Sequence, residues 1–128
     1  MKKFDTKRKA AVGEGLEQLP GANGERSVAL FEHGSLVVKV YAPRGTDPQQ
    51  PHSRDEAYIV ARGTGEFVHG ETRVSFEAGD FLFAAAGEAH RFENFTDDFA
   101  VWVLFYGPEG GELTEAKKTN YRDAETLR

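Results

Sequence analysis

Apolar and polar residues alternate along most of the chain in short runs that are separated by turns. Two such runs lie within residues 27–41, on either side of a Glu-His-Gly-Ser sequence that is typical of a tight turn, so we predict a β-hairpin there. Further extended runs cover residues 56–62, 66–68, 71–76, 81–83, 89–95 and 99–106. Seven or eight short strands at this spacing indicate an all-β fold, either a sandwich or a jelly-roll barrel.

One segment interrupts this series of strands. Residues 42–51 contain three prolines, Pro43, Pro48 and Pro51. Proline removes a backbone hydrogen-bond donor and disfavours both a helix interior and a central strand. We therefore predict a loop between the hairpin and the later strands.

The pattern also predicts how the chain is divided. No internal repeat and no linker are visible, which favours a single barrel domain over residues 27–111. Residues 1–26 contain Val12, Leu16 and Leu19 but are too short to form a layer of their own, so we expect an N-terminal arm that packs on the barrel or on a partner, in a homodimer. Residues 112–128 are charged and lose the alternation, as expected of a peripheral tail.

Charge and composition exclude several classes of protein. The 21 acidic and 16 basic residues give a formal net charge of −5, which argues against a large nucleic-acid surface. No apolar run is long enough to span a bilayer, no secretory signal follows the basic residues at the start, and cysteine is absent. These features favour a cytoplasmic protein that binds neither nucleic acid nor membranes.

The four histidines fall into two groups. His33 and His69 stand beside glycine in predicted turns, where exposed polar side chains are ordinary. His52 lies four residues before Glu56, so an extended strand would project both from one face, and a later strand could bring His90 beside them. Two imidazoles and a carboxylate with open positions suit a divalent first-row ion. By spacing alone, the same set also arises often by chance.

Two motifs strengthen the metal hypothesis. Residues 51–66 resemble the first motif of the cupin superfamily, with His52 and Glu56 in the places of its His and Glu. Residues 79–94 resemble the second motif of the same superfamily, with His90 in the place of its His. The resemblance implies a jelly-roll (double-stranded β-helix) barrel of the RmlC-like kind. It implies one divalent ion held by these three residues, and usually a homodimer.

The chain departs from the cupin pattern at two positions. Gln50 stands where the first motif often has another histidine, and Ala85 replaces the usual proline of the second motif. The amide oxygen of Gln50 would complete a four-ligand set if the backbone carried it to the face of His52. Alternatively, Pro51 turns Gln50 toward solvent and water takes its place. With either set, the ion would be Fe, Mn, Zn or Ni.

Functions in the family range over dioxygenases, isomerases, epimerases, decarboxylases and non-catalytic binders. We expect a metalloenzyme of the dioxygenase or isomerase type that acts on a small polar or anionic metabolite, because three protein ligands leave positions open on the ion. The alternative is a metal-bearing module that binds or senses a small molecule without turnover. The candidate substrate-binding residues are Arg54, Tyr58, Phe92 and Trp102, although each has an ordinary structural explanation.

Overall fold

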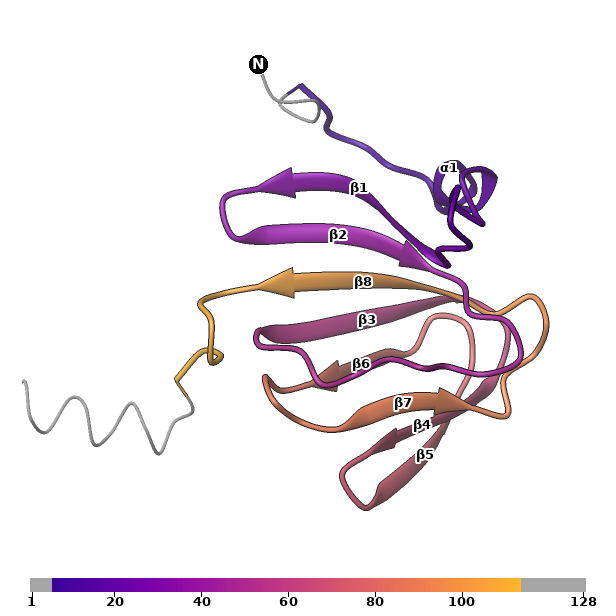
Figure 1. Cartoon of the computed structure of the whole chain (residues 1–128), viewed down its shortest axis with the longest axis vertical. Helices are drawn as coiled ribbons and strands as arrows, with labels where there is room; N and C mark the ends of the chain where they lie inside the picture. The colour runs from indigo at the N-terminus through magenta and orange to yellow at the C-terminus, as the bar shows by residue number, and fades with distance from the viewer. Residues whose placement is uncertain (1–5, 114–128) are drawn as a thin grey trace, which may run out of the picture.

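The computed structural model describes residues 6–113, which form one short helix and eight strands (Figure 1). The elements are α1 (Val12–Glu17), β1 (Ser27–His33), β2 (Leu36–Tyr41), β3 (Asp55–Arg62), β4 (Gly65–His69), β5 (Thr72–Phe76), β6 (Phe81–Ala84), β7 (His90–Glu93) and β8 (Ala100–Tyr106). The predicted hairpin, the proline-rich loop and the later strands are all found, and the all-β prediction is confirmed.

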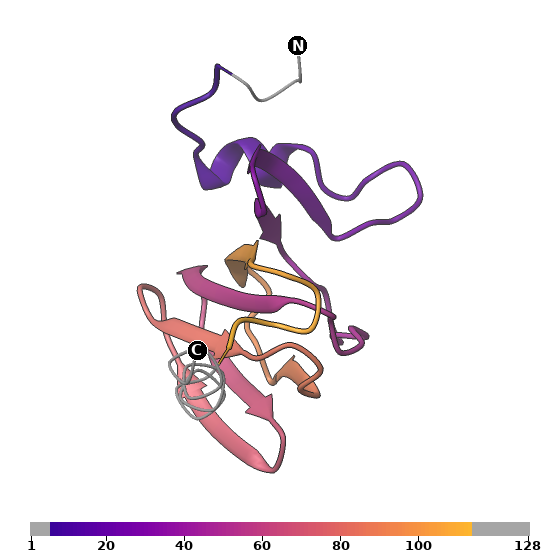
Figure 2. The same cartoon turned by 90° about the vertical axis from the view of Figure 1, so that its left-hand side faces the viewer.

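The strands form two antiparallel sheets. The larger sheet has the order β1-β2-β8-β3-β6, and the smaller one has the order β5-β4-β7. In Figure 2 the hairpin of β1 and β2 lies with α1 at one end of the molecule, and β4 and β5 lie at the other. This is the jelly-roll arrangement of a small barrel.

The core lies between the sheets and is built largely of aromatic rings. Alternation along β3 buries Glu56, Tyr58 and Val60, while Ile59 between them is 37% exposed. Phe92 of β7 lies with its ring centre 4.9 Å from that of Phe99 and 5.1 Å from that of Tyr58. The many phenylalanines of the sequence therefore fill the space between two faces of alternating side chains.

The segment before β1 packs on the hairpin. Helix α1 contacts β1 and β2, and Gly15 lies so close to β2 that an added Cβ would stand 2.6 Å from the Cβ of Val40. Val40 is fully buried as a result. Most of the predicted tail, residues 114–128, lies outside the described residues, and the division into arm, barrel and tail stays a prediction.

Among residues 6–113, the short α1 does not approach the length and hydropathy that a membrane-crossing helix requires.

Candidate metal centre

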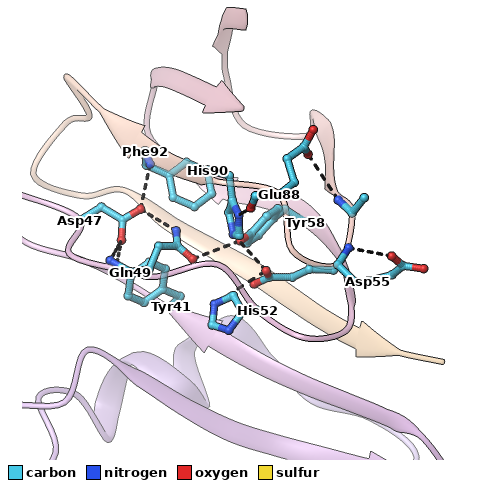
Figure 3. Close-up of polar contacts among 12 residues, drawn as sticks. Tyr41, Asp47, Gln49, His52, Asp55, Tyr58, Glu88, His90 and Phe92 are labelled. Atoms are coloured by element: carbon cyan, nitrogen blue, oxygen red, sulfur yellow. Dashed lines mark hydrogen bonds and ion pairs between the residues drawn. The ribbon is translucent and has the colours of Figure 1, made fainter. Parts of the chain in front are cut away.

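The fold brings three residues together that are far apart in the sequence. His52 comes from the loop before β3, Glu56 is the second residue of β3, and His90 is the first residue of β7. Because β3 and β7 belong to opposite sheets, the three side chains meet between the two sheets. Figure 3 shows His52 and His90 approaching the same place from the loop and from β7.

The distances between the donor atoms are short enough for one ion. Nε2 of His90 lies 3.1 Å from Oε1 of Glu56, and Nε2 of His52 lies 3.8 Å from the same oxygen. One donor atom of each residue lies within 4.8 Å of the others. Since bonds of about 2.0–2.2 Å hold two ligands at most about 4.4 Å apart, a small movement of the more exposed His52 side chain closes the set.

Two buried atoms of this group lack a hydrogen-bond partner among the described residues: Oε1 of Glu56 and Nε2 of His90. The other ring nitrogen of His90, Nδ1, lies 2.8 Å from the carbonyl oxygen of Glu88. A carbonyl only accepts, so Nδ1 carries the proton and the lone pair of a neutral ring points from Nε2 toward Glu56. Two facing lone pairs in a buried place call for a cation between them. The residues therefore fit a metal ion.

The electrostatics of His90 agree with this arrangement. Burial lowers the pKa of His90, but the contact with Glu56 and the hydrogen bond to the Glu88 carbonyl raise it more, so the net pKa lies above the ordinary value. The surroundings of His90 thus favour positive charge beside the Glu56 carboxylate, and a metal ion competes with a proton for that place.

A hydrogen-bond network built around the Asp47 carboxylate lies beside the centre, on its loop side (Figure 3). The buried Asp47 carboxylate accepts hydrogen bonds from the Phe92 amide at 2.8 Å, from the Gln49 side chain at 2.6 Å and from the Tyr41 hydroxyl. Gln49 in turn accepts a hydrogen bond of 3.4 Å from the hydroxyl of Tyr58. The loop is therefore tied to β7 and its orientation is fixed.

The two tyrosines of this network stay protonated. Burial, followed by the charge of Glu56, raises the pKa of Tyr58. Burial, followed by the hydrogen bond to Asp47, raises the pKa of Tyr41. Both hydroxyls are therefore available as hydrogen-bond donors and not as bases.

A pocket of about 180 Å³ opens beside the centre. It is smaller than the roughly 300–1,000 Å³ of sites for drug-sized ligands. Its walls come from the start of β1, from β2 and β8, from the loop and from the metal group: Ser27, Lys39, Tyr41, Pro48, Gln49, His52, Glu56, Val103 and Phe105. The geometry suits a small molecule that reaches the metal group.

Comparison with known proteins identifies the fold family. The family model described as a cupin domain matches residues 37–106, more than half of the chain. This chain belongs to the cupin family. It is 31% identical over 96 residues to the uncharacterized protein SCO3923 of Streptomyces coelicolor, and the match covers 73% of this chain and 91% of that protein.

Solved structures share the cupin fold at lower identity. KdgF from Halomonas sp. superposes with a TM-score of 0.57 and 17% identity, over 65% of this chain and 80% of that chain. The DMSP lyase DddQ from Ruegeria pomeroyi superposes with a TM-score of 0.57 and 24% identity, over 77% of this chain and 55% of that chain. A cupin 2 conserved barrel domain protein from Salinispora arenicola superposes with a TM-score of 0.53 and 21% identity, over 77% of this chain and 82% of that chain. These likenesses show the fold and no particular reaction.

The remaining candidate residues take different places in the cupin barrel. Gln50 is exposed and does not line the pocket, whereas its neighbour Gln49 does. The guanidinium of Arg54 donates to the carbonyl of Gly107 at 3.0 Å and also to the carbonyl of Ser35, so it ties the hairpin turn to the end of β8. Arg54 is not among the lining residues of the pocket.

The candidate aromatic residues also separate. Tyr58 and Phe92 are buried in the core beneath the centre. Trp102 lies between Val101 and Val103 on β8, and its side chain is on the opposite face of the sheet, near Phe31 and residues 8–10. The structure therefore does not bring Trp102 into the pocket.

Sequence reasoning overlooked two features of the centre. Asp47 and Gln49 stand in the proline-rich loop, where no local signal marks them as site residues. His69, which the pattern assigned to an exposed turn, is half-buried and ends β4 directly opposite His90. Its ring stacks on Phe67 at 5.5 Å.

Proposed function

We propose that this cupin binds one divalent metal ion through His52, Glu56 and His90, and that it is a metalloenzyme of the dioxygenase or isomerase type that acts on a small polar or anionic molecule. One observation carries the proposal: the buried Nε2 of His90 and Oε1 of Glu56 face each other at 3.1 Å without a hydrogen-bond partner among the described residues. A cation between them satisfies both atoms.

The residues in and around the centre have different roles. The Glu88 carbonyl fixes the tautomer and the ring orientation of His90, and Glu56 supplies the one negative charge among the three ligands. A bound divalent ion supplies Lewis acidity and open coordination positions. Tyr58 stays a neutral phenol beneath the centre, held by Gln49. The ring of Phe105 lies 5.0 Å from that of His52 and forms an apolar wall on that side of the pocket.

The comparisons support an enzyme in a general way. One structural neighbour is, by its name, a DMSP lyase, so at least one protein that shares this fold is an enzyme. At 24% identity its substrate does not transfer to this chain. The alternative of a binding or sensing module is distinguished by a metabolite screen on the metal-loaded protein: saturable binding without a product identifies the module, and metal-dependent turnover identifies the enzyme.

The three-ligand set is tested by elemental analysis of purified protein and of matched histidine variants. We expect about one equivalent of a divalent metal in the parent protein and its loss in His90→Ala. The control is His69→Ala, because His69 pairs with His90 across the strands but lies outside the three-ligand group. Metal retained in His90→Ala, or absent from a parent protein supplied with metal, contradicts the proposal.

We also infer a homodimer. Apolar side chains of Ile59, Phe81 and Phe83 are 37%, 61% and 40% exposed at the side of the larger sheet that ends in β6. A second copy would cover them, and closed two-fold symmetry is the commonest arrangement of protein oligomers. Light scattering at micromolar concentration should give twice the mass of one chain, and a single-chain mass contradicts the inference.

A further inference from the structure

A lysine enters the pocket beside the metal group. Lys39 is in the middle of β2, where it lies directly opposite Val103 of β8, and both side chains line the pocket with His52 and Glu56. Val40, the next residue of β2, lies on the other face of the sheet beneath α1. The alternation of the strand therefore turns the ammonium group of Lys39 toward the pocket side.

The ammonium group of Lys39 has no counter-ion in the part of the chain that the structure describes. Within the described residues, Lys39 takes part in no hydrogen bond and no ion pair, although it is half-buried. The two nearby carboxylates have other roles. Asp47 is occupied by Tyr41, Gln49 and a backbone amide, and Glu56 belongs to the metal group. A half-buried cation without a partner is a natural contact for an anionic ligand.

The charge of the loaded pocket sets the charge of its ligand. A divalent ion held by the Glu56 carboxylate and two neutral imidazoles keeps one positive charge, and Lys39 adds a second. A ligand with two negative charges would balance both. One anionic group would face the ion and the other would pair with Lys39.

The dimensions and walls of the pocket limit the body of that ligand. Lys39 pairs with Val103 of β8, and Glu56 pairs with Phe105 of the same strand, so Lys39 and Glu56 are two strands and two residues apart. About 12 Å therefore separates their main chains, at roughly 4.8 Å per strand and 3.3 Å per residue. The side chains of Lys39 and of the metal group take up much of that span. Val103, Phe105 and Pro48 offer apolar wall between the two ends. A short carbon chain fits this space.

We infer that the ligand or substrate of this site is a short dicarboxylate, with one carboxylate directed to the metal and the other held by Lys39. The inference rests on the proposed metal site. It assigns Lys39 as a residue that determines specificity, because its contact distinguishes a dianion from a monoanion of the same shape. Arginine at this position would keep the charge, and methionine would keep most of the volume without it.

The test compares two probes that differ in one charge. Succinate carries two carboxylates, whereas succinamate carries one carboxylate and a neutral amide of similar size. Both are titrated by calorimetry into manganese-loaded parent protein, Lys39→Met and Lys39→Arg. The charge control is Arg62→Met, because Arg62 is exposed and lies six residues beyond Glu56 on β3, about 20 Å away at roughly 3.3 Å per residue.

We expect the parent protein and Arg62→Met to bind succinate about tenfold more tightly than succinamate, a difference of about 1.4 kcal/mol. Lys39→Met should bind both probes alike with unchanged metal content, and Lys39→Arg should restore most of the preference. Equal binding of the two probes by the parent, no binding of either, or a preference that survives in Lys39→Met overturns the inference alone. If elemental analysis of the same samples finds no manganese in the parent, the proposed function and the inference both fail.

Discussion

The two sides of the metal centre differ in burial and in what holds their side chains. Glu56 and His90 come from strands of opposite sheets, and their side chains are 3% and 1% exposed. His52 comes from a loop, and its side chain is 38% exposed. The buried pair is fixed by the sheets, and Oε1 of Glu56 and Nε2 of His90 have no hydrogen-bond partner among the described residues. The open side is held by the network around Asp47 and by the hydrogen bond of 2.7 Å from the Gly87 amide to the His52 carbonyl. The buried side therefore determines whether an ion binds, and the open side determines what reaches it.

The largest expected effect comes from removing a member of the buried pair. His90→Ala should weaken manganese binding by more than about a hundredfold, because water cannot readily replace a buried direct ligand, and its loss then exceeds the 10–100-fold cost of losing a supporting partner. Calorimetric titration of chelator-treated protein measures this. His33→Ala is the control, since His33 is an exposed histidine at the end of β1. Parent-like affinity in His90→Ala would show that the buried pair is not the centre of the site.

The hydrogen-bond network that holds the open side should contribute to the free energy of unfolding. In Asp47→Asn, the amide replaces one acceptor oxygen and leaves donors such as the Phe92 amide or the Tyr41 hydroxyl without a partner. We expect the free energy of unfolding to fall by about 1–3 kcal/mol, as measured by urea denaturation. Asp97→Asn, at an exposed aspartate, should stay within about 0.5 kcal/mol of the parent. Equal stabilities of the two variants would show that the network does not hold the loop.

The exposed ligand should contribute less than the buried ones. His52→Ala should weaken manganese binding about tenfold, or 1.4 kcal/mol, because water can enter the exposed position and replace the imidazole. The same titration as for His90→Ala gives the comparison directly. A loss in His52→Ala as large as that in His90→Ala would remove the distinction between the two sides.

The smallest effect should be that of Gln50. Its exposure favours the alternative in which water, and not the amide, takes the fourth position. Gln50→Ala should therefore bind manganese as the parent does. A clear weakening in Gln50→Ala, together with tighter binding in Gln50→His, would instead identify the amide oxygen as a ligand.

The strands could be predicted from sequence because each one has a buried and an exposed face. The predicted run of residues 56–62 corresponds to β3, which begins one residue earlier, and the other runs agree with the structure within two residues at each end. Alternation also reports faces: the position of Lys39 on β2 and of Trp102 on β8 follows from their neighbours once the inner face is known. Which face is inner depends on pairing between distant strands, and this is why Trp102 was a candidate from sequence.

The sequence predicted which residues form the three-ligand group, but not which elements position their side chains. His52 was expected to share a strand with Glu56, but β3 begins at Asp55 and the loop places His52. Gln49, and not Gln50, lines the pocket because Asp47 holds the Gln49 side chain. The Asp47 carboxylate is itself held by a backbone amide 45 residues later in the chain. No local pattern carries that information, since it arises only when the loop packs against β7.

The metal centre is tested most directly by an anomalous-difference map from crystals of the protein grown with manganese. We predict a single strong peak between the two sheets, about 2.0–2.2 Å from Nε2 of His90, Nε2 of His52 and Oε1 of Glu56. A map without a peak at this position, with His90 and Glu56 instead joined by a direct hydrogen bond in the presence of manganese, would contradict it.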